Sequence, residues 1–398
     1  MHFYILNAYA PFSYSDSSRH HLYSRCLLEQ GHTVTLLTSG SRSDKRSSSF
    51  LSIRALRHPP YVYLVATHLR ARYIEWLEYS LRSFLFIFNS IQAESTCVVY
   101  ASHVHPFALL VGFLLKVIYP CKVLLISEVR DLWPYSLLFK TSILHSSPIY
   151  YLIKRYFYFI LGRSDLCIFL VPGGPKYFHK LTSNTIVLPN PVCLQGISNT
   201  NTVDDIAFVY SGSLNKINGI QLLIEAISYF AVKATSCLSS HHLRRVRFLF
   251  IGSGTESHTI EKLVTHLHTL GITASYNGCL SRADALEQER ACRYSILPII
   301  PQPVHIYGTS QNKVVSSILA CNHIIYTGAL AGGTLIDYYP YVITADPTPE
   351  SLSNAILTCA VNSLKSDYTK LDKSLIEPFV NAFSPYDQCL RISNALNL

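Results

Sequence analysis

The chain has 398 residues, of which 49% are hydrophobic and 14% are charged, and its formal net charge is +9 at pH 7. This composition excludes a disordered chain, and the length favours two domains over a single core. The basic balance suits an anionic partner, such as a nucleic acid, an acidic lipid surface or a phosphorylated substrate.

Strand-like and helix-like runs alternate along the first half of the chain. Short apolar runs predict strands at 2–8, 32–39, 97–102, 122–129, 166–171 and 185–189. Helical patterns lie between them, including 17–31, which ends on a glycine, and 106–119. Near-continuous apolar strands separated by helices indicate a parallel sheet covered on both faces.

The same alternation restarts after residues 189–205, a stretch rich in Pro, Asn and Thr that predicts a linker. The second set of predicted strands lies at 206–214, 246–254, 272–280, 294–300, 323–328 and 341–346. The sequence therefore predicts two α/β domains in tandem. Because such sheets bind ligands outside the carboxyl ends of their strands, we expect the site in a cleft between the domains.

The remaining composition bears on location. The 11 cysteines include no C-x-x-C pair, which predicts buried thiols in a reducing compartment rather than disulfides or a zinc site. The N-terminus lacks the pattern of a signal peptide. The longest apolar runs, 106–120 and 150–162, are interrupted by Lys or Arg and fall short of the ~20 clean residues of a membrane span. We therefore expect a cytoplasmic protein.

A charged loop, "SEVRDLWP", closes the predicted strand 122–129. Dense charge at a strand end is where such folds build their sites, so we predict that Glu128 faces the ligand. Arg130 and Asp131 would brace the loop as an ion pair on the acceptor side. The alternative is that all three charges form only a local structural clasp.

Two motifs carry a family resemblance. "EVRDLWP" at 128–134 and "YGTSQNK" at 307–313 resemble motifs of the retaining family 4 glycosyltransferases, in the branch that builds bacterial surface polysaccharides. "ILNAYAPF", "VVYASHVHP", "YSGSLNKINGIQLLIEA" and "FLFIGSG" resemble the same branch in the same order. The resemblance implies the α/β GT-B architecture, two Rossmann-like domains facing each other across a cleft.

The resemblance also implies the role of each domain. Residues 1–195 would form the acceptor-side domain and residues 205–375 the domain that binds a nucleotide-sugar donor. The segment 376–398 would return as a helix to the first domain, and the apolar spacing of Phe383, Cys389, Leu390 and Ile392 fits a partly buried helix.

"YGTSQNK" reads as a loop that enters a helix, where free backbone N–H groups and the helix dipole favour a phosphate. Lys313 adds a positive charge at the same place. An ordinary capped helix with a surface lysine is the alternative. With the resemblance, the predicted donor-binding residues are Gly212, Lys216, Gly252, Gly308, Thr309, Ser310, Asn312, Lys313 and Ser316.

The chain departs from the family pattern at three positions. Gly308 and Ser316 stand where many family members carry two glutamates, one for the donor sugar and one for the ribose. Ser213 replaces a basic residue that often follows the glycine of the first loop. The Ser316 hydroxyl would still hydrogen-bond a ribose, more weakly than a carboxylate.

Further candidates lie in the first domain. Family members use a histidine where His105 stands, so we predict that His105 and Glu128 act on the reacting sugars, with His103 as the spare candidate. For a lone histidine, a satisfied loop residue is the alternative. Asp16 and Arg19, in the first loop, would border the acceptor, with solvated loop residues as the alternative.

The sequence thus predicts transfer of a sugar from a nucleotide donor to a surface polysaccharide acceptor, lipid-linked, with retention. It shows no metal-binding motif, so we expect neither a metal nor another cofactor. Aromatic and basic residues in 147–163 suggest a helix that is either a core helix or in peripheral contact with an anionic membrane. No nucleic-acid motif accompanies the basic residues. The alternatives are a nucleotide-sugar 2-epimerase and a non-catalytic scaffold.

Overall fold

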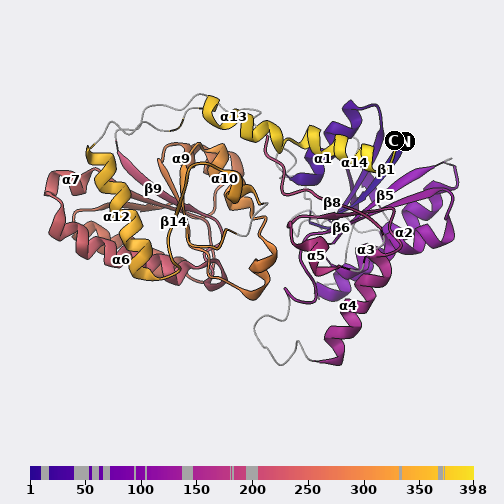
Figure 1. Ribbon diagram of the computed structural model, residues 1–398, viewed down its shortest axis with the longest axis horizontal. Helices are drawn as coiled ribbons and strands as arrows, with labels where there is room; N and C mark the ends of the chain where they lie inside the picture. The colour runs from indigo at the N-terminus through magenta and orange to yellow at the C-terminus, as the bar shows by residue number, and fades with distance from the viewer. Residues whose placement is uncertain are drawn as a thin grey trace. The chain divides into compact units, whose positions relative to one another are not determined.

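The computed structural model describes residues 1–9, 18–39, 53–55, 62–65, 72–93, 96–103, 105–136, 147–179, 181, 183–193, 205–330, 334–365, 371 and 373–398. They belong to two compact units (Figure 1). The first comprises Met1–Pro191 and Phe383–Leu398, and the second comprises Val192–Ala382. Residues 376–382, predicted to start the returning helix, thus lie in the second unit.

The first unit is built on an eight-stranded sheet in the order β3-β4-β2-β1-β5-β6-β7-β8. The strands are β1 (His2–Leu6), β2 (Thr33–Ser39), β3 (Ile53–Ala55), β4 (Val62–Val65), β5 (Cys97–His103), β6 (Val123–Val129), β7 (Leu166–Phe169) and β8 (Asn184–Val187). All neighbours pair in parallel except β3 with β4. The predicted parallel sheet is confirmed, whereas β3 and β4 lie in a stretch without a predicted strand.

Helices cover both faces of this sheet (Figure 1). They are α1 (Arg19–Glu29), α2 (Arg72–Ile91), α3 (Pro106–Ile118), α4 (Pro148–Leu161), α5 (Gly174–Tyr177) and α14 (Pro385–Ala395). Right-handed crossovers place α2, α3 and α4 on one face, because each leads toward the β8 edge, and α1 on the opposite face. Helix α14 packs beside α1, where Cys389 and Ile392 join Tyr23 and Leu27 in the core.

The second unit contains a fully parallel six-stranded sheet in the order β11-β10-β9-β12-β13-β14. The strands are β9 (Ile206–Ser211), β10 (Val246–Ile251), β11 (Thr273–Tyr276), β12 (Tyr294–Leu297), β13 (His323–Tyr326) and β14 (Val342–Thr344). The chain builds from β9 toward β11 and then crosses to β12 on the other side. In open α/β sheets, ligands bind at the carboxyl ends of the strands where the strand order reverses, which are β9 and β12 in this sheet.

Helices and two 3-10 turns connect these strands. They are η3 (Lys216–Asn218), α6 (Ile220–Cys237), α7 (Ser240–Arg244), α8 (Ser257–Thr269), α9 (Arg282–Arg290), η4 (Pro303–Tyr307), α10 (Asn312–Leu319), α11 (Leu335–Tyr338), α12 (Pro349–Lys365) and α13 (Lys373–Ala382). Within the described residues, no helix is long and apolar enough to cross a membrane. The cysteines are free thiols, but the prediction that they are buried is wrong for Cys121, Cys237 and Cys279, which are exposed.

Candidate functional site

Two glycines bring the first loops of the second unit into contact. Gly212 follows β9 directly and Gly252 follows β10. Gly252 has a φ of 134°, and a Cβ added there would lie 1.8 Å from the carbonyl oxygen of Gly212. A side chain is therefore excluded, and the two loop backbones pack directly against each other at the carboxyl edge of the sheet.

Lys313, in the first turn of α10, lies across this loop. A Cβ added to Gly212 would be 2.6 Å from Lys313 Cε. The Lys313 ammonium donates hydrogen bonds to Tyr210 Oη at 2.8 Å and to Asn218 Oδ1 at 3.2 Å, and it lies 4.8 Å from the centre of the Tyr210 ring. Burial lowers the pKa of Lys313 to about 8.

The partners of Lys313 are neutral. In the part of the chain that the structure describes, no carboxylate forms an ion pair with its ammonium. A half-buried cation whose charge is not balanced favours an anion nearby. Lys313 also stands beside the N-terminus of α10, whose N-cap Gln311 makes no side-chain capping bond with the described residues. The positive end of the helix dipole and the ammonium therefore act in the same region.

The other donor-side candidates occupy different settings. Gly308 is buried, with a φ of 92°, and links η4 to the loop that carries Thr309 and Ser310. Asn312 is exposed at the first position of α10. Lys216 is also exposed, on η3, and the described contacts do not join it to Lys313. The contact of Lys216 with a donor phosphate stays a prediction.

Ser316 has no carboxyl group of its own, but a carboxylate from another helix lies beside it. The Ser316 hydroxyl donates a hydrogen bond of 2.5 Å to Glu289 Oε2. Glu289 comes from α9 and is only 2% exposed, and burial raises the pKa of its carboxyl. Sequence reasoning missed Glu289 because it lies 27 residues away from Ser316 and only the packing of α9 on α10 joins them.

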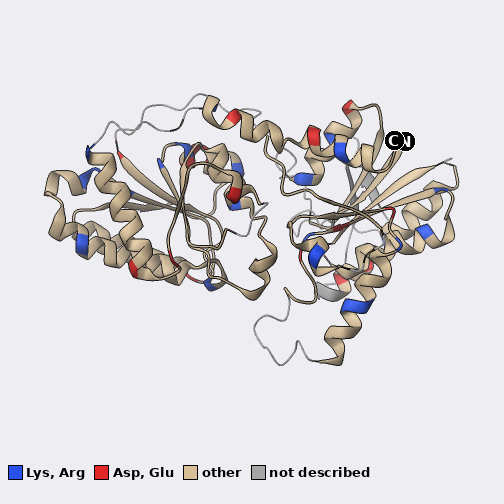
Figure 2. Ribbon diagram, viewed as in Figure 1, with Lys and Arg blue, Asp and Glu red and all other residues tan. Residues whose placement is uncertain are grey.

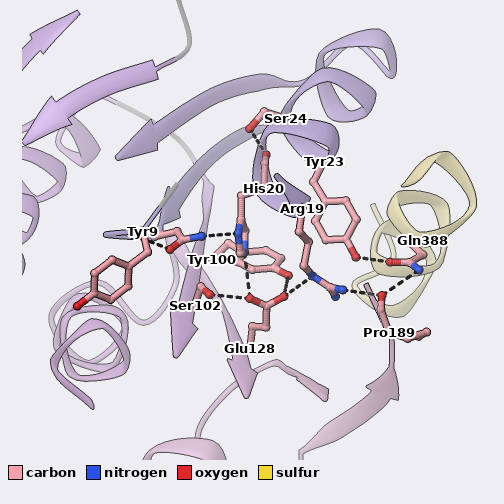
Figure 3. A network of polar contacts seen from close by, with 11 residues as sticks. Tyr9, Arg19, His20, Tyr23, Ser24, Tyr100, Ser102, Glu128, Pro189 and Gln388 are labelled. Atoms are coloured by element: carbon pink, nitrogen blue, oxygen red, sulfur yellow. Dashed lines mark hydrogen bonds and ion pairs between the residues drawn. The ribbon is translucent and has the colours of Figure 1, made fainter. Parts of the chain in front are cut away.

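Glu128, at the end of β6, is the centre of a buried polar network in the first unit (Figure 3). It is 0% exposed. Its carboxylate accepts hydrogen bonds from Arg19 Nε at 2.7 Å, His20 Nε2 at 3.0 Å, Tyr100 Oη at 2.8 Å and Ser102 Oγ at 2.6 Å. These four donors come from α1 and β5, so the carboxylate joins β6 to both elements.

The hydrogen bonds define the charge of the network. Burial raises the pKa of the Glu128 carboxyl, but His20 and Arg19 outweigh burial and hold the pKa well below its usual value. Burial lowers the pKa of His20. Since Asn7 Nδ2 donates to His20 Nδ1 at 2.7 Å, the ring is neutral and donates to Glu128 through Nε2–H. Arg19 is therefore the cation that balances Glu128.

Arg19 also shares a hydrogen-bond acceptor with the C-terminal helix. Arg19 donates to the carbonyl oxygen of Pro189 at 2.6 Å, and Gln388 of α14 donates to that oxygen at 3.1 Å. Gln388 in turn accepts a hydrogen bond from Tyr23 of α1. One continuous set of polar contacts thus ties α1, β6 and α14 together.

These contacts differ from the orientation predicted for the loop. Glu128 and Arg19 are both buried, and each balances the other's charge. Among the described residues, Arg130 and Asp131 form no ion pair, although the charge of Arg130 opposes the rise that burial causes in the pKa of Asp131. Asp16 lies outside the described residues. A direct role of Glu128 in sugar transfer stays a prediction.

Two buried histidines lie at the end of β5. His105, the N-cap of α3, stacks on Trp76 with ring centres 5.4 Å apart, and His103 lies edge-on between Trp133 and Phe157. Burial lowers the pKa of His103 to about 3 and that of His105 to about 4, so both rings are neutral. No hydrogen bond from the described residues satisfies their ring nitrogens. Such nitrogens are the groups that a polar ligand or water satisfies.

Comparison with known proteins identifies the fold. No protein-family model and no curated protein sequence matches this chain. Sucrose-phosphate synthase from Thermosynechococcus elongatus is similar with a TM-score of 0.68 and 15% identity, over 99% of this chain and 98% of that one.

Two further solved structures show the same likeness. Anabaena HepE, in complex with UDP and glucose, has a TM-score of 0.60 and 15% identity, over 100% and 99% of the two chains. WaaG, a glycosyltransferase involved in lipopolysaccharide biosynthesis, has a TM-score of 0.57 and 13% identity, over 92% and 91%. At these identities the likeness shows the fold alone. The chain has the GT-B fold of two Rossmann-like units, as predicted.

Proposed function

We propose that this protein is a glycosyltransferase that takes a sugar from a nucleoside-diphosphate donor. The observation that carries the proposal is the Lys313 ammonium, which is held at the carboxyl edge of β9, beside the α10 N-terminus, by two neutral oxygens. A diphosphate supplies the negative charge that this arrangement favours.

The chemistry follows from where charge develops. When the bond between the sugar and the diphosphate breaks, negative charge grows on the leaving phosphate. Lys313 and the backbone N–H groups at the start of α10 stabilise that charge, which is the role that a metal ion has in other sugar transferases. In this proposal, therefore, neither a metal nor another cofactor is needed.

The donor and acceptor are proposed from the likenesses. HepE was solved with UDP and glucose, and a trehalose-6-phosphate protein from E. coli, with a TM-score of 0.65 and 10% identity, was solved with UDP-2-fluoro glucose. These titles favour a UDP-sugar as the first donor to assay. The motif resemblance and the role of WaaG in lipopolysaccharide biosynthesis favour a lipid-linked saccharide acceptor, retention at the anomeric carbon and peripheral contact with the inner face of the membrane.

A second candidate function is non-catalytic nucleotide binding. Gly308 and Ser316 have no carboxylate of their own, and the carboxylate that accompanies Ser316 is buried. Such a protein would bind the nucleotide and act as a partner or scaffold. Release of free sugar or transfer of labelled sugar from the donor separates the enzyme from the scaffold.

The test begins with UDP and GDP binding measured by calorimetry. Lys313→Ala should weaken nucleotide binding by ~1.5–3 kcal/mol, the contribution of a hydrogen bond to a charged group. Because the free ammonium has a pKa of about 8, affinity should also fall as the pH rises through that value. The control is Lys262→Ala, at an exposed lysine of α8. If Lys313→Ala binds UDP and GDP as tightly as the wild type, the diphosphate does not bind at this site.

A further inference from the structure

Helix α2 of the first unit has apolar side chains on its solvent side as well as on its buried side. Ile74, Leu77, Leu81 and Leu85 are all exposed and follow one another at intervals of three or four residues. This spacing forms a continuous apolar stripe along the helix. A surface helix normally carries polar residues at these positions, so the stripe is suited to a partner.

The two neighbouring helices extend the same surface. Leu114, Val117 and Ile118 are exposed near the end of α3. On α4, Ile149, Tyr151, Leu152 and Phe159 are exposed, and Leu152 reaches 69%.

Aromatic contacts hold the three helices together. The ring centres of Phe88 of α2 and Tyr119, just after α3, are 5.6 Å apart, and those of Phe113 of α3 and Phe159 of α4 are 5.3 Å apart. Because the three helices cover one face of the sheet, their outward sides form one surface, here called the α2–α4 face (Figure 1). Exposed apolar side chains gathered on neighbouring helices mark an interaction site.

The charges on this surface are mostly positive, although α2 also contributes Glu75 and Glu78. Helices α3 and α4 contain lysine and arginine but no acidic residue (Figure 2). Arg155 and Arg163 are exposed, and the guanidinium of Arg163 lies 3.8 Å from the centre of the Phe159 ring. On α2, by contrast, Glu78 is paired with Arg82. The α2–α4 face thus combines apolar and aromatic side chains with an excess of positive charge.

We infer that the α2–α4 face docks on an anionic lipid surface. Apolar and aromatic side chains enter the headgroup boundary, while arginines beside them contact acidic headgroups. A second copy of this chain fits less well, because a two-fold interface would bring Arg155 and Arg163 of both copies to the same surface. The inference names the surface that makes the membrane contact of the proposed function. Only the purpose of that contact rests on the proposed function.

The test is flotation of the full chain with vesicles of phosphatidylcholine alone and with vesicles in which about a third of the lipid is phosphatidylglycerol. The wild type should bind the anionic vesicles. The double variant Leu81→Gln/Leu152→Gln should lower the partition coefficient at least about 10-fold, because each leucine contributes apolar surface. Arg155→Glu/Arg163→Glu should cause a similar loss on anionic vesicles.

The control is Val232→Gln on α6, a side chain that is 64% exposed in the second unit, which should bind vesicles like the wild type. Equal binding to both vesicle types, or full binding by the leucine variant, would overturn the inference. A dimer that the leucine variant abolishes, without any vesicle binding, would assign the face to a second copy instead. UDP binding by the same variants reports separately on the proposed function, since these substitutions lie outside the donor-binding residues.

Discussion

At the scale of single residues, the site depends on contacts between side chains far apart in the sequence. Ser316 donates to the buried carboxylate of Glu289, so its hydroxyl proton is fixed and its oxygen lone pairs are left to accept a hydrogen bond. A ribose hydroxyl is a suitable donor for that oxygen. Glu289 would then act as a positioning residue for Ser316 rather than as a ligand.

We therefore expect Glu289→Gln to weaken UDP binding about 3- to 10-fold, as for one hydrogen bond, while pyrophosphate binding stays unchanged. The measurement is calorimetric titration with both ligands. Glu287→Gln, at an exposed position of the same helix, is the matched control. An equal loss for UDP and pyrophosphate would show that Glu289 supports the fold and not the ribose contact.

At the scale of the elements, Glu128 connects one strand to a helix and to the neighbouring strand. It joins β6 to α1 through Arg19 and His20, and to β5 through Tyr100 and Ser102. Removing one partner of a buried ion pair leaves the other charge uncompensated, which costs about 3–5 kcal/mol. Of the three charged residues in the "EVRD" loop, Glu128 is therefore the one that lies in the interior of the unit.

We expect Glu128→Gln to lower the free energy of unfolding by several kcal/mol, measured in urea, while Glu29→Gln, exposed on α1, has little effect. The pH dependence has a definite sign. The folded-state pKa of Glu128 lies below the usual 4.5, so its contribution is fully present above pH 4.5 and is lost as the pH falls through the folded-state value. A variant with unchanged stability and reduced transfer would instead support the direct role predicted from the sequence.

At the scale of the whole molecule, the end of the chain completes the first unit. Helix α14 buries Cys389 and Ile392 beside α1 and adds the hydrogen bonds of Gln388. The first unit is thus made from both ends of the sequence, and the second lies entirely between them. Loosening α14 should therefore affect the first unit before the second.

Ile392→Ala should cost about 2–5 kcal/mol, because Ile392 is buried and its loss leaves a cavity. Hydrogen exchange should then quicken in α1 and β1, while the second unit keeps its protection. Leu390→Ala on the same helix is the control, since Leu390 is exposed. Faster exchange in both units would mean that they unfold as one.

The sequence alone determined the two α/β halves and the position of the Lys313 loop. Apolar runs such as 123–129 and 246–251 have a local periodicity that follows from burial on both faces of a sheet, so they are visible without a structure. Gly252 could likewise be identified because it follows a strand directly.

Tertiary structure alone decided which side chains meet. Tyr210 and Asn218 hold Lys313, Glu289 reaches Ser316, and Glu128 turns inward to Arg19 across 109 residues of chain. The exposed apolar stripe of α2 could not be predicted either, because the same spacing of apolar residues occurs in helices whose apolar face is buried. Periodicity records that a residue is apolar, and only packing decides whether another part of the protein covers it.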